Sequence, residues 1–289
     1  MLLRLYFLVT AFVLRILGAR RVRFKVGETS LLAYEIGPSE GEPWVLLHGL
    51  GATALSWSSE IFKFRKQVRL LVPELSILGG TRSSGDGLNA VEGASVVTAA
   101  ILRWEPDRPV TLAGISLGGW MAIRIAHDRP ELVERLLLID AAGYRDQDWE
   151  RIRALTDVSH LEDVDRLYQA LFYRTPFMFQ MSRRAFFQGY SSPAVKHVLA
   201  TTEPEDAYGP EELEEIKVPT LLIWGEYDGL FHLEVARAIE LHLPNAHLVV
   251  LPRAGHAVHW EYPRATVRTV DLFRREGLAG FDRSAKRAA

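Results

Sequence analysis

One short segment constrains the fold of this chain more than any other: a serine between two glycines, where an apolar run meets a helical pattern. The segment reads Leu112-Ala113-Gly114-Ile115-Ser116-Leu117-Gly118-Gly119. Residues 109–113 have the pattern of a short buried strand, and residues 120–126 are rich in good helix formers. A strand that turns sharply into a helix leaves no room for a Cβ beside the turn, which explains the glycines around Ser116. The segment therefore predicts a serine hydroxyl exposed at a helix N-terminus, where free N–H groups favour negative charge.

Three other apolar runs each end in a short polar or glycine-containing loop. Residues 44–47 lead into His48-Gly49-Leu50-Gly51, whose glycines allow a backbone N–H to be turned towards a substrate oxygen. We expect the N–H groups of Leu50 and Leu117 to form an oxyanion hole. Residues 220–224 lead into Gly225-Glu226-Tyr227-Asp228, and residues 247–251 lead into Pro252-Arg253-Ala254-Gly255-His256. The candidate nucleophile, acid and base thus follow in the order Ser116, Asp228, His256.

These motifs resemble the α/β-hydrolase superfamily, whose triad residues follow in this order on loops at the C-terminal ends of three strands. The resemblance covers roughly residues 22–273, apart from an inserted middle section. Within the superfamily, the chain looks similar to the capped monoacylglycerol lipases. It implies an α/β fold in which a mostly parallel sheet is flanked by helices and carries a helical cap. It also implies that Ser116 attacks an acyl carbonyl, that His256 takes and returns the proton, and that Asp228 fixes the imidazole tautomer.

Two of these roles have competitors in the sequence. Glu226 and Asp140 are alternative acids, and Asp140 ends an apolar run after which some relatives place the acid. His259 competes with His256 as the base, although the Gly-His pair after the last strand favours His256. The chain also departs from the family pattern at Glu74, which stands where relatives often have an aspartate.

Composition agrees with one globular enzyme and excludes several other classes. The chain has 289 residues, of which 48% are apolar, so it can bury a large core. A formal net charge of -2 offers no electrostatic argument for nucleic acid. With no cysteine, the chain has no disulfide, thiolate metal site or cysteine nucleophile. The remaining histidines lack metal-ligand spacing and no phosphate or dinucleotide loop is present, so we expect no metal and no cofactor.

The first twenty residues differ from the rest, because they are apolar apart from a threonine and arginines. At about 100° per residue, Arg4 and Arg15 fall on one face of a helix. This narrow basic stripe predicts a membrane-associating helix over residues 1–20, either peripheral or monotopic, with a signal anchor as the next alternative. A helix packed on the protein's own surface is a further alternative. Without a membrane role, the location would be cytoplasmic.

We predict a hydrolase core over residues 21–142 and 216–289, interrupted by a helical cap over residues 143–215. The cap is rich in aromatic side chains, and a surplus of these would favour an apolar acyl chain above Ser116. The expected substrate contacts, drawn from the oxyanion loop, its neighbourhood and the cap, are His48, Gly49, Trp57, Phe172, Phe177 and Phe186. In the superfamily, however, the histidine at His48 usually braces the oxyanion loop.

The expected activity is hydrolysis of carboxylic esters with apolar acyl chains, such as monoacylglycerols, through an acyl-enzyme. The partner would be a small-molecule or lipid ester, met at a membrane surface. One alternative is a hydrolase that cleaves carbon–carbon bonds of ring-cleavage products, which would need an arginine near the pocket to hold a dienol carboxylate. A second is a ligand-binding protein of the same fold without catalysis. Because Ser116, Asp228 and His256 are all present, the sequence favours an enzyme over a ligand-binding protein.

Overall fold

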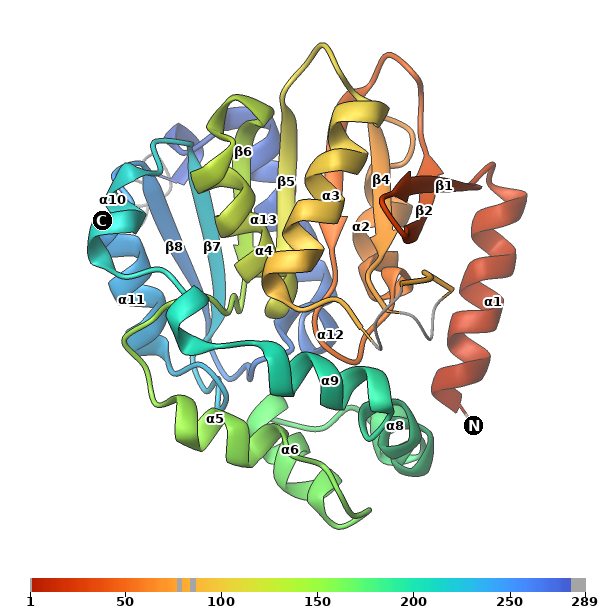
Figure 1. The fold of residues 1–289 in the computed structure, drawn as a ribbon, viewed down its shortest axis with the longest axis vertical. Coiled ribbons are helices and arrows are strands. Elements are labelled where there is room, and N and C mark those ends of the chain that lie inside the picture. Colours follow the sequence, from red (N-terminus) through yellow and green to blue (C-terminus); the bar gives the residue numbers. More distant parts are fainter. Residues whose placement is uncertain (1, 77–79, 84–86, 282–289) are drawn as a thin grey trace.

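An eight-stranded sheet forms the centre of the protein (Figure 1). The computed structural model describes residues 2–76, 80–83 and 87–281. The strand order is β1-β2-β4-β3-β5-β6-β7-β8. Strands β1 and β2 pair antiparallel, as do β2 and β4, whereas β4, β3, β5, β6, β7 and β8 run parallel. The bounds are β1 Arg20–Val26, β2 Thr29–Ile36, β3 Glu42–Leu47, β4 Val68–Glu74, β5 Val110–Ile115, β6 Val133–Ile139, β7 Thr220–Gly225 and β8 Ala246–Leu251.

Helices cover both faces of this sheet, which confirms the predicted α/β class. They are α1 Leu2–Ile16, α2 Ser58–Phe64, α3 Ala90–Trp104, α4 Leu117–Asp128, α11 Leu233–His242, α12 Val258–Glu261 and α13 Pro263–Glu276. Alternate side chains of the buried strands point to opposite faces. In β6, Leu136 and Leu138 join the core under α3, α4 and α11, whereas Leu137 and Ile139 join the core under α2 and α13. Burial on both faces explains why the parallel strands read as continuous apolar runs.

The segment between β6 and β7 is helical and lies across the carboxyl ends of the strands (Figure 1). Its helices are α5 Trp149–Thr156, α6 Asp163–Leu171, α7 Phe177–Gln180, α8 Arg183–Tyr190, α9 Pro193–Thr201 and α10 Pro210–Glu215. Their apolar side chains form a separate cluster with Leu50 and Ala257 of the core. This placement covers the edge of the sheet where loops from different strands converge.

The N-terminal helix α1 packs against the protein along one side. Leu14 and Thr10 are buried in this contact. The Tyr6 hydroxyl lies 2.6 Å from Ser58 Oγ of α2, and the Leu3 N–H donates to Ser182 Oγ of the cap at 2.9 Å. Helix α1 therefore bridges the core and the cap. Among the described residues, no helix has both the length and the apolar character needed to cross a membrane.

Candidate active site

The turn at Ser116 has the geometry that the glycines around it predict. Ser116 joins β5 to α4 with φ of 52° and ψ of -118°, in a region that side chains rarely occupy. A Cβ on Gly114 would lie 2.2 Å from the Gly118 carbonyl oxygen, and one on Gly118 would lie 2.3 Å from the Leu47 carbonyl oxygen. Both contacts are with backbone, so no side chain can move to relieve them. The two glycines allow three backbone segments to meet beneath Ser116.

His256 and Asp228 meet on neighbouring loops at the ends of β8 and β7. Asp228 Oδ2 lies 2.8 Å from Nδ1 of His256, and both side chains are buried. The other carboxylate oxygen, Oδ1, accepts the N–H groups of Leu230 and Phe231, each at 2.8 Å. The ring of Phe231 packs edge-on against the imidazole at 5.1 Å. These contacts fix the position of the carboxylate and the plane of the imidazole.

The alternative acids are used elsewhere. Asp140 is completely buried, and its carboxylate accepts the N–H groups of Gly225 at 3.0 Å and Val258 at 3.3 Å. Through these hydrogen bonds, Asp140 links the end of β7 to the start of α12. Burial, reinforced by the nearby charge of Asp228, raises the pKa of Asp140 well above its usual range. Glu226 is exposed and accepts the N–H of Arg253.

The predicted oxyanion loop faces the serine. A Cβ placed on Gly49 would lie 3.2 Å from Ser116 Cβ and 3.8 Å from its Oγ, so the loop backbone passes directly beside the hydroxyl. Leu117 is the first residue of α4, where the backbone N–H has no acceptor within the helix. Leu50 and Leu117 both line the cavity that contains Ser116. The two residues whose N–H groups are expected to bind an oxyanion thus lie in the same cavity as Ser116.

His48 lies behind this loop and supports it. Its Nδ1 lies 2.8 Å from the Gly49 carbonyl oxygen, and its Nε2 lies 3.0 Å from Oε1 of Glu74. Glu74 Oε2 also accepts the N–H of Ala54, where the loop ends. Glu74 is buried, and it connects β4 to both ends of the oxyanion loop. The expectation that His48 contacts substrate is therefore corrected, because both ring nitrogens are occupied by the protein.

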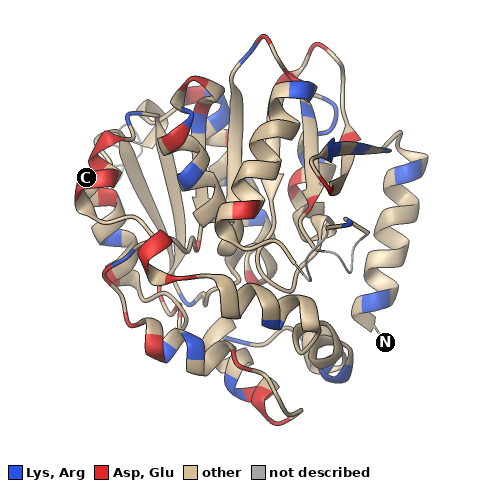
Figure 2. Ribbon diagram, viewed as in Figure 1, with Lys and Arg blue, Asp and Glu red and all other residues tan. Residues whose placement is uncertain are grey.

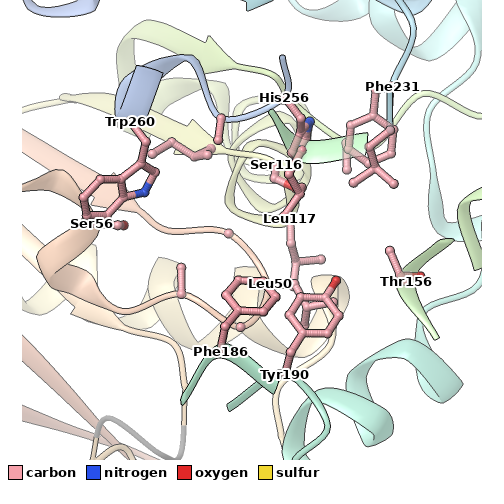
Figure 3. A pocket seen from close by; sticks show the side chains of 18 of the residues that line it. Leu50, Ser56, Ser116, Leu117, Thr156, Phe186, Tyr190, Phe231, His256 and Trp260 are labelled. Carbon is pink, nitrogen blue, oxygen red and sulfur yellow. The ribbon is translucent and has the colours of Figure 1, made fainter. Parts of the chain in front are cut away.

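Ser116 and His256 line one largely apolar cavity of about 190 Å³ (Figure 3). Figure 3 shows the two side chains adjacent at one wall, with Phe186 and Tyr190 of the cap opposite. The lining comes from segments far apart in the sequence, including α1, the predicted oxyanion loop, α4, the cap and α12. Among the described residues that line it, none is Arg, Lys, Asp or Glu. In the same described part of the chain, no cluster of side chains has the composition to hold a metal ion.

The predicted substrate contacts divide into two groups. Gly49, Phe172 and Phe186 line the cavity. Trp57 and Phe177 do not, and these two expectations are corrected. The Trp57 side chain is fully buried in the core beneath α2, and Phe177 is 69% exposed on the outside of the cap. From sequence alone, an aromatic residue close to the predicted site looks the same whether its side chain packs in the core, lines the cavity or faces solvent.

His259 lines the cavity, although no hydrogen bond joins it to any of the three candidate acids. The side chain is buried, and its Nδ1 has no hydrogen-bond partner. Burial, together with the nearby charge of His256, lowers the pKa of His259 to about 3. His259 is therefore a neutral imidazole at physiological pH, whereas His256 carries the carboxylate contact expected of a base.

Several lining residues were not identified from sequence. Leu3 and Phe7 of α1 line the cavity although they lie far from Ser116 in the sequence, and Phe7 packs edge-on against Trp260, which also lines it. No local pattern distinguishes these residues from the other apolar residues of α1. Tyr190, in contrast, lies in the aromatic run of the cap, and its ring packs against the position of Gly51, where φ is +67°. A side chain at residue 51 would collide with that ring.

The comparison with known proteins agrees with this architecture. Residues 44–269 match the model of the alpha/beta hydrolase family. Because this match spans most of the chain, the protein belongs to the alpha/beta hydrolase family, as the sequence predicts. Hydrolase activity is the property that its relatives share.

Individual relatives differ in the bond that they cleave. The chain is 29% identical over 246 residues to a pimeloyl-[acyl-carrier protein] methyl ester esterase of Pectobacterium carotovorum, covering 79% of this chain and 92% of that protein. It is 28% identical over 268 residues to a 2-hydroxy-6-oxononadienedioate/2-hydroxy-6-oxononatrienedioate hydrolase of Burkholderia vietnamiensis, covering 81% and 87%. Among solved structures, a membrane phospholipase A described as a bacterial virulence factor superposes with a TM-score of 0.79 at 23% identity, covering 93% and 92%.

Proposed function

We propose that this protein is a serine esterase that cleaves carboxylic esters with apolar acyl chains through an acyl-enzyme. Ser116 is the nucleophile, His256 is the general base and then the general acid, and Asp228 holds His256 with its proton on Nδ1. Nε2 is then free to take the proton of the Ser116 hydroxyl. The N–H groups of Leu50 and Leu117 stabilise the oxyanion of the tetrahedral intermediate, and water releases the acid in the second half-reaction.

The observation that carries the substrate class is that no Arg, Lys, Asp or Glu is among the described residues that line the cavity. An acyl chain enters such a space without losing hydrogen bonds, because it has none to lose. A dienol carboxylate would arrive with a negative charge, and the described lining offers no Arg or Lys to pair with it. The cavity therefore favours ester hydrolysis over cleavage of carbon–carbon bonds.

A fluorophosphonate probe tests the nucleophile. Wild type should be labelled and Ser116→Ala should not. Ser56→Ala is a matched control, because Ser56 lines the same cavity but its hydroxyl donates to the Thr53 carbonyl oxygen. Labelling of Ser56→Ala at the wild-type level, together with loss in Ser116→Ala, supports the assignment. An unlabelled wild type, or equal labelling of Ser116→Ala, would instead favour a ligand-binding protein without catalysis.

The substrate class is tested by comparing rates on p-nitrophenyl esters of graded acyl length, on monoacylglycerols and on a dienol carboxylate. We expect kcat/KM to rise from acetate towards longer acyl chains, because each buried methylene adds about 0.8 kcal/mol of apolar transfer energy. Acetate as the best ester would refute the apolar-acyl proposal. Turnover of the dienol carboxylate alone would favour the carbon–carbon hydrolase.

We also propose that the enzyme works at a membrane surface, to which α1 attaches it without spanning the bilayer. Support comes from the many large apolar side chains that α1 leaves exposed although the helix is packed on the protein. A lipid ester is sparingly soluble in water, so a surface attachment would bring the enzyme to its substrate.

A further inference from the structure

Helix α1 presents two different faces, and its inner face is part of the active-site cavity. Leu3 and Phe7 line the cavity together with Ser116. Phe7 and Tyr6 pack edge-on against Trp260, with ring centroids at 6.2 Å and 5.6 Å. Trp260 itself lines the cavity on the segment that carries His256. The N-terminal half of α1 is therefore one wall of the space where the substrate would bind.

The outer face of α1 is apolar and largely exposed. Leu8, Phe12 and Ile16 are 70%, 65% and 68% exposed, and Leu5 and Val9 are more than half exposed. We call these five residues the outer strip. At about 100° per residue they occupy one continuous arc, opposite Leu3, Thr10 and Leu14. A contiguous strip of large apolar side chains is the usual mark of an interaction surface.

The outer strip has neighbours of the same kind on the cap. Helix α7 packs against α1, and there Phe177 and Met181 are both more than half exposed. Met181 directly precedes Ser182, which accepts the Leu3 N–H. The apolar surface thus crosses the joint between α1 and the cap, at the level where Leu3 enters the cavity.

Charge favours an anionic lipid surface as the occupant. Helix α1 has no acidic residue, and its two arginines, Arg4 and Arg15, are exposed near its two ends (Figure 2). In the helical projection both lie along one edge of the outer strip. Arg20, Arg21 and Arg23 follow on β1 and are also exposed. Arginines beside an apolar strip can reach lipid phosphates while the strip enters the acyl region. A second copy of this chain paired strip to strip would instead bring arginines close to arginines.

We infer that the outer strip, with Phe177 and Met181, lies on an anionic bilayer, and that the lipid ester enters the cavity from the bilayer beneath the N-terminal half of α1. The first part deepens the proposed membrane attachment, and the second part rests in addition on the proposed esterase function. Among the described residues, two hydrogen bonds join the N-terminal half of α1 to the cap, namely Leu3 N–H with Ser182 Oγ and Arg4 with Gln188 Oε1 at 2.7 Å, and Leu3 also packs against the apolar side chains of the cap. Parting these contacts opens the cavity on the lipid side.

Co-sedimentation of the full chain with vesicles tests the surface. With equal parts of phosphatidylcholine and phosphatidylglycerol, the triple variant Leu8→Ser/Phe12→Ser/Ile16→Ser should partition at least about ten-fold more weakly than wild type. Arg15→Gln should bind about five-fold more weakly to these vesicles and be unchanged on pure phosphatidylcholine. Leu241→Ser is the matched control, because Leu241 is 78% exposed on α11, at the far side of the molecule from α1.

Two results would overturn the lipid assignment. One is vesicle binding by the triple variant that equals wild type. The other is a wild-type dimer, seen by light scattering, that becomes a monomer in the triple variant, since the occupant of the strip would then be a second copy of the chain. Circular dichroism of each variant checks that the fold is retained, which we expect because the substituted side chains are exposed.

The entry route is tested with a soluble ester and a vesicle-embedded ester. The triple variant should hydrolyse p-nitrophenyl butyrate within about two-fold of wild type but lose activity on long-chain monoacylglycerol in vesicles in proportion to binding. Because the chain has no cysteine, Arg4→Cys/Gln188→Cys carries a single pair of thiols. Joining them with a cleavable bifunctional thiol reagent should block hydrolysis of the vesicle ester without abolishing binding, and dithiothreitol should restore it.

Full activity of the cross-linked protein on the vesicle ester would refute entry beneath α1. If wild type hydrolyses neither ester, the esterase proposal fails, and the binding measurements still decide the surface. The two proposals can therefore fail separately.

Discussion

Replacing Asp228 by asparagine should remove activity while leaving the fold intact, and the reason lies in how the carboxylate is held. Oδ1 accepts two backbone N–H groups, from Leu230 and Phe231. An asparagine at this position keeps those bonds only if its carbonyl oxygen takes the place of Oδ1. Its NH2 group must then face Nδ1 of His256, where Oδ2 lies at 2.8 Å in the native protein.

A donor facing Nδ1 forces that nitrogen to act as an acceptor, so the imidazole proton moves to Nε2. Nε2 then has no lone pair with which to take the Ser116 proton. An asparagine that imposes the wrong tautomer in a triad of this kind lowers kcat by about 10⁴, equivalent to roughly 5 kcal/mol of transition-state stabilisation. Asp228→Ala should be less stable than Asp228→Asn, because it leaves two buried N–H groups without an acceptor, at about 1–3 kcal/mol.

Steady-state hydrolysis of p-nitrophenyl butyrate measures this loss, with urea denaturation as the stability control. Asp140→Asn is the matched variant, since Asp140 is equally buried but bonds only to the backbone at Gly225 and Val258. We expect it to retain kcat within about ten-fold and to lose about 1–3 kcal/mol of stability. Wild-type kcat in Asp228→Asn, or an equally inactive but folded Asp140→Asn, would refute the assignment of the acid.

Three other variants test separate parts of the structure. Glu60 is fully buried, neither of its carboxyl oxygens has a hydrogen-bond partner, and burial raises its pKa from 4.5 to about 8. The stability that the protonated carboxyl contributes is therefore fully present below pH 4.5 and is lost as pH rises through 8. Between pH 5 and 8, urea denaturation of wild type should show a loss about 3 kcal/mol larger than that of Glu60→Gln, and parallel curves would contradict this. His259→Gln should keep the shape of the pH–rate profile from pH 5 to 8, because the pKa of His259 is already about 3. His256→Gln should be inactive. An inactive His259→Gln would instead assign the general base to residue 259. Gly118→Ala should fail to fold or lose most of its activity, because its Cβ would collide with the Leu47 carbonyl oxygen. Gly189→Ala on α8 is the control, where a Cβ meets nothing within 4 Å, and it should be as stable as wild type or more stable. Wild-type activity and stability of Gly118→Ala would refute the close approach of Leu47.

The parts of the site that could be predicted are those specified by neighbours in the chain. The turn at Ser116 needs small residues on both sides, and the strand before it and the helix after it have distinct periodicities. The same local logic identified the loops after β3, β7 and β8. Since parallel strands bring their carboxyl ends to one edge of the sheet, these loops had to converge once the fold was recognised.

Local patterns along the chain were thus enough to predict the fold class, the turn at Ser116 and the small set of candidate acids and bases. The packing of distant elements was needed to show that Asp228 contacts His256, that Trp57 packs in the core while Phe177 faces outward, and that α1 lines the cavity. The physical reason is that an apolar or acidic side chain has the same local signature wherever it points. Its surroundings depend on how distant elements pack, and those contacts are formed between residues that lie far apart along the chain.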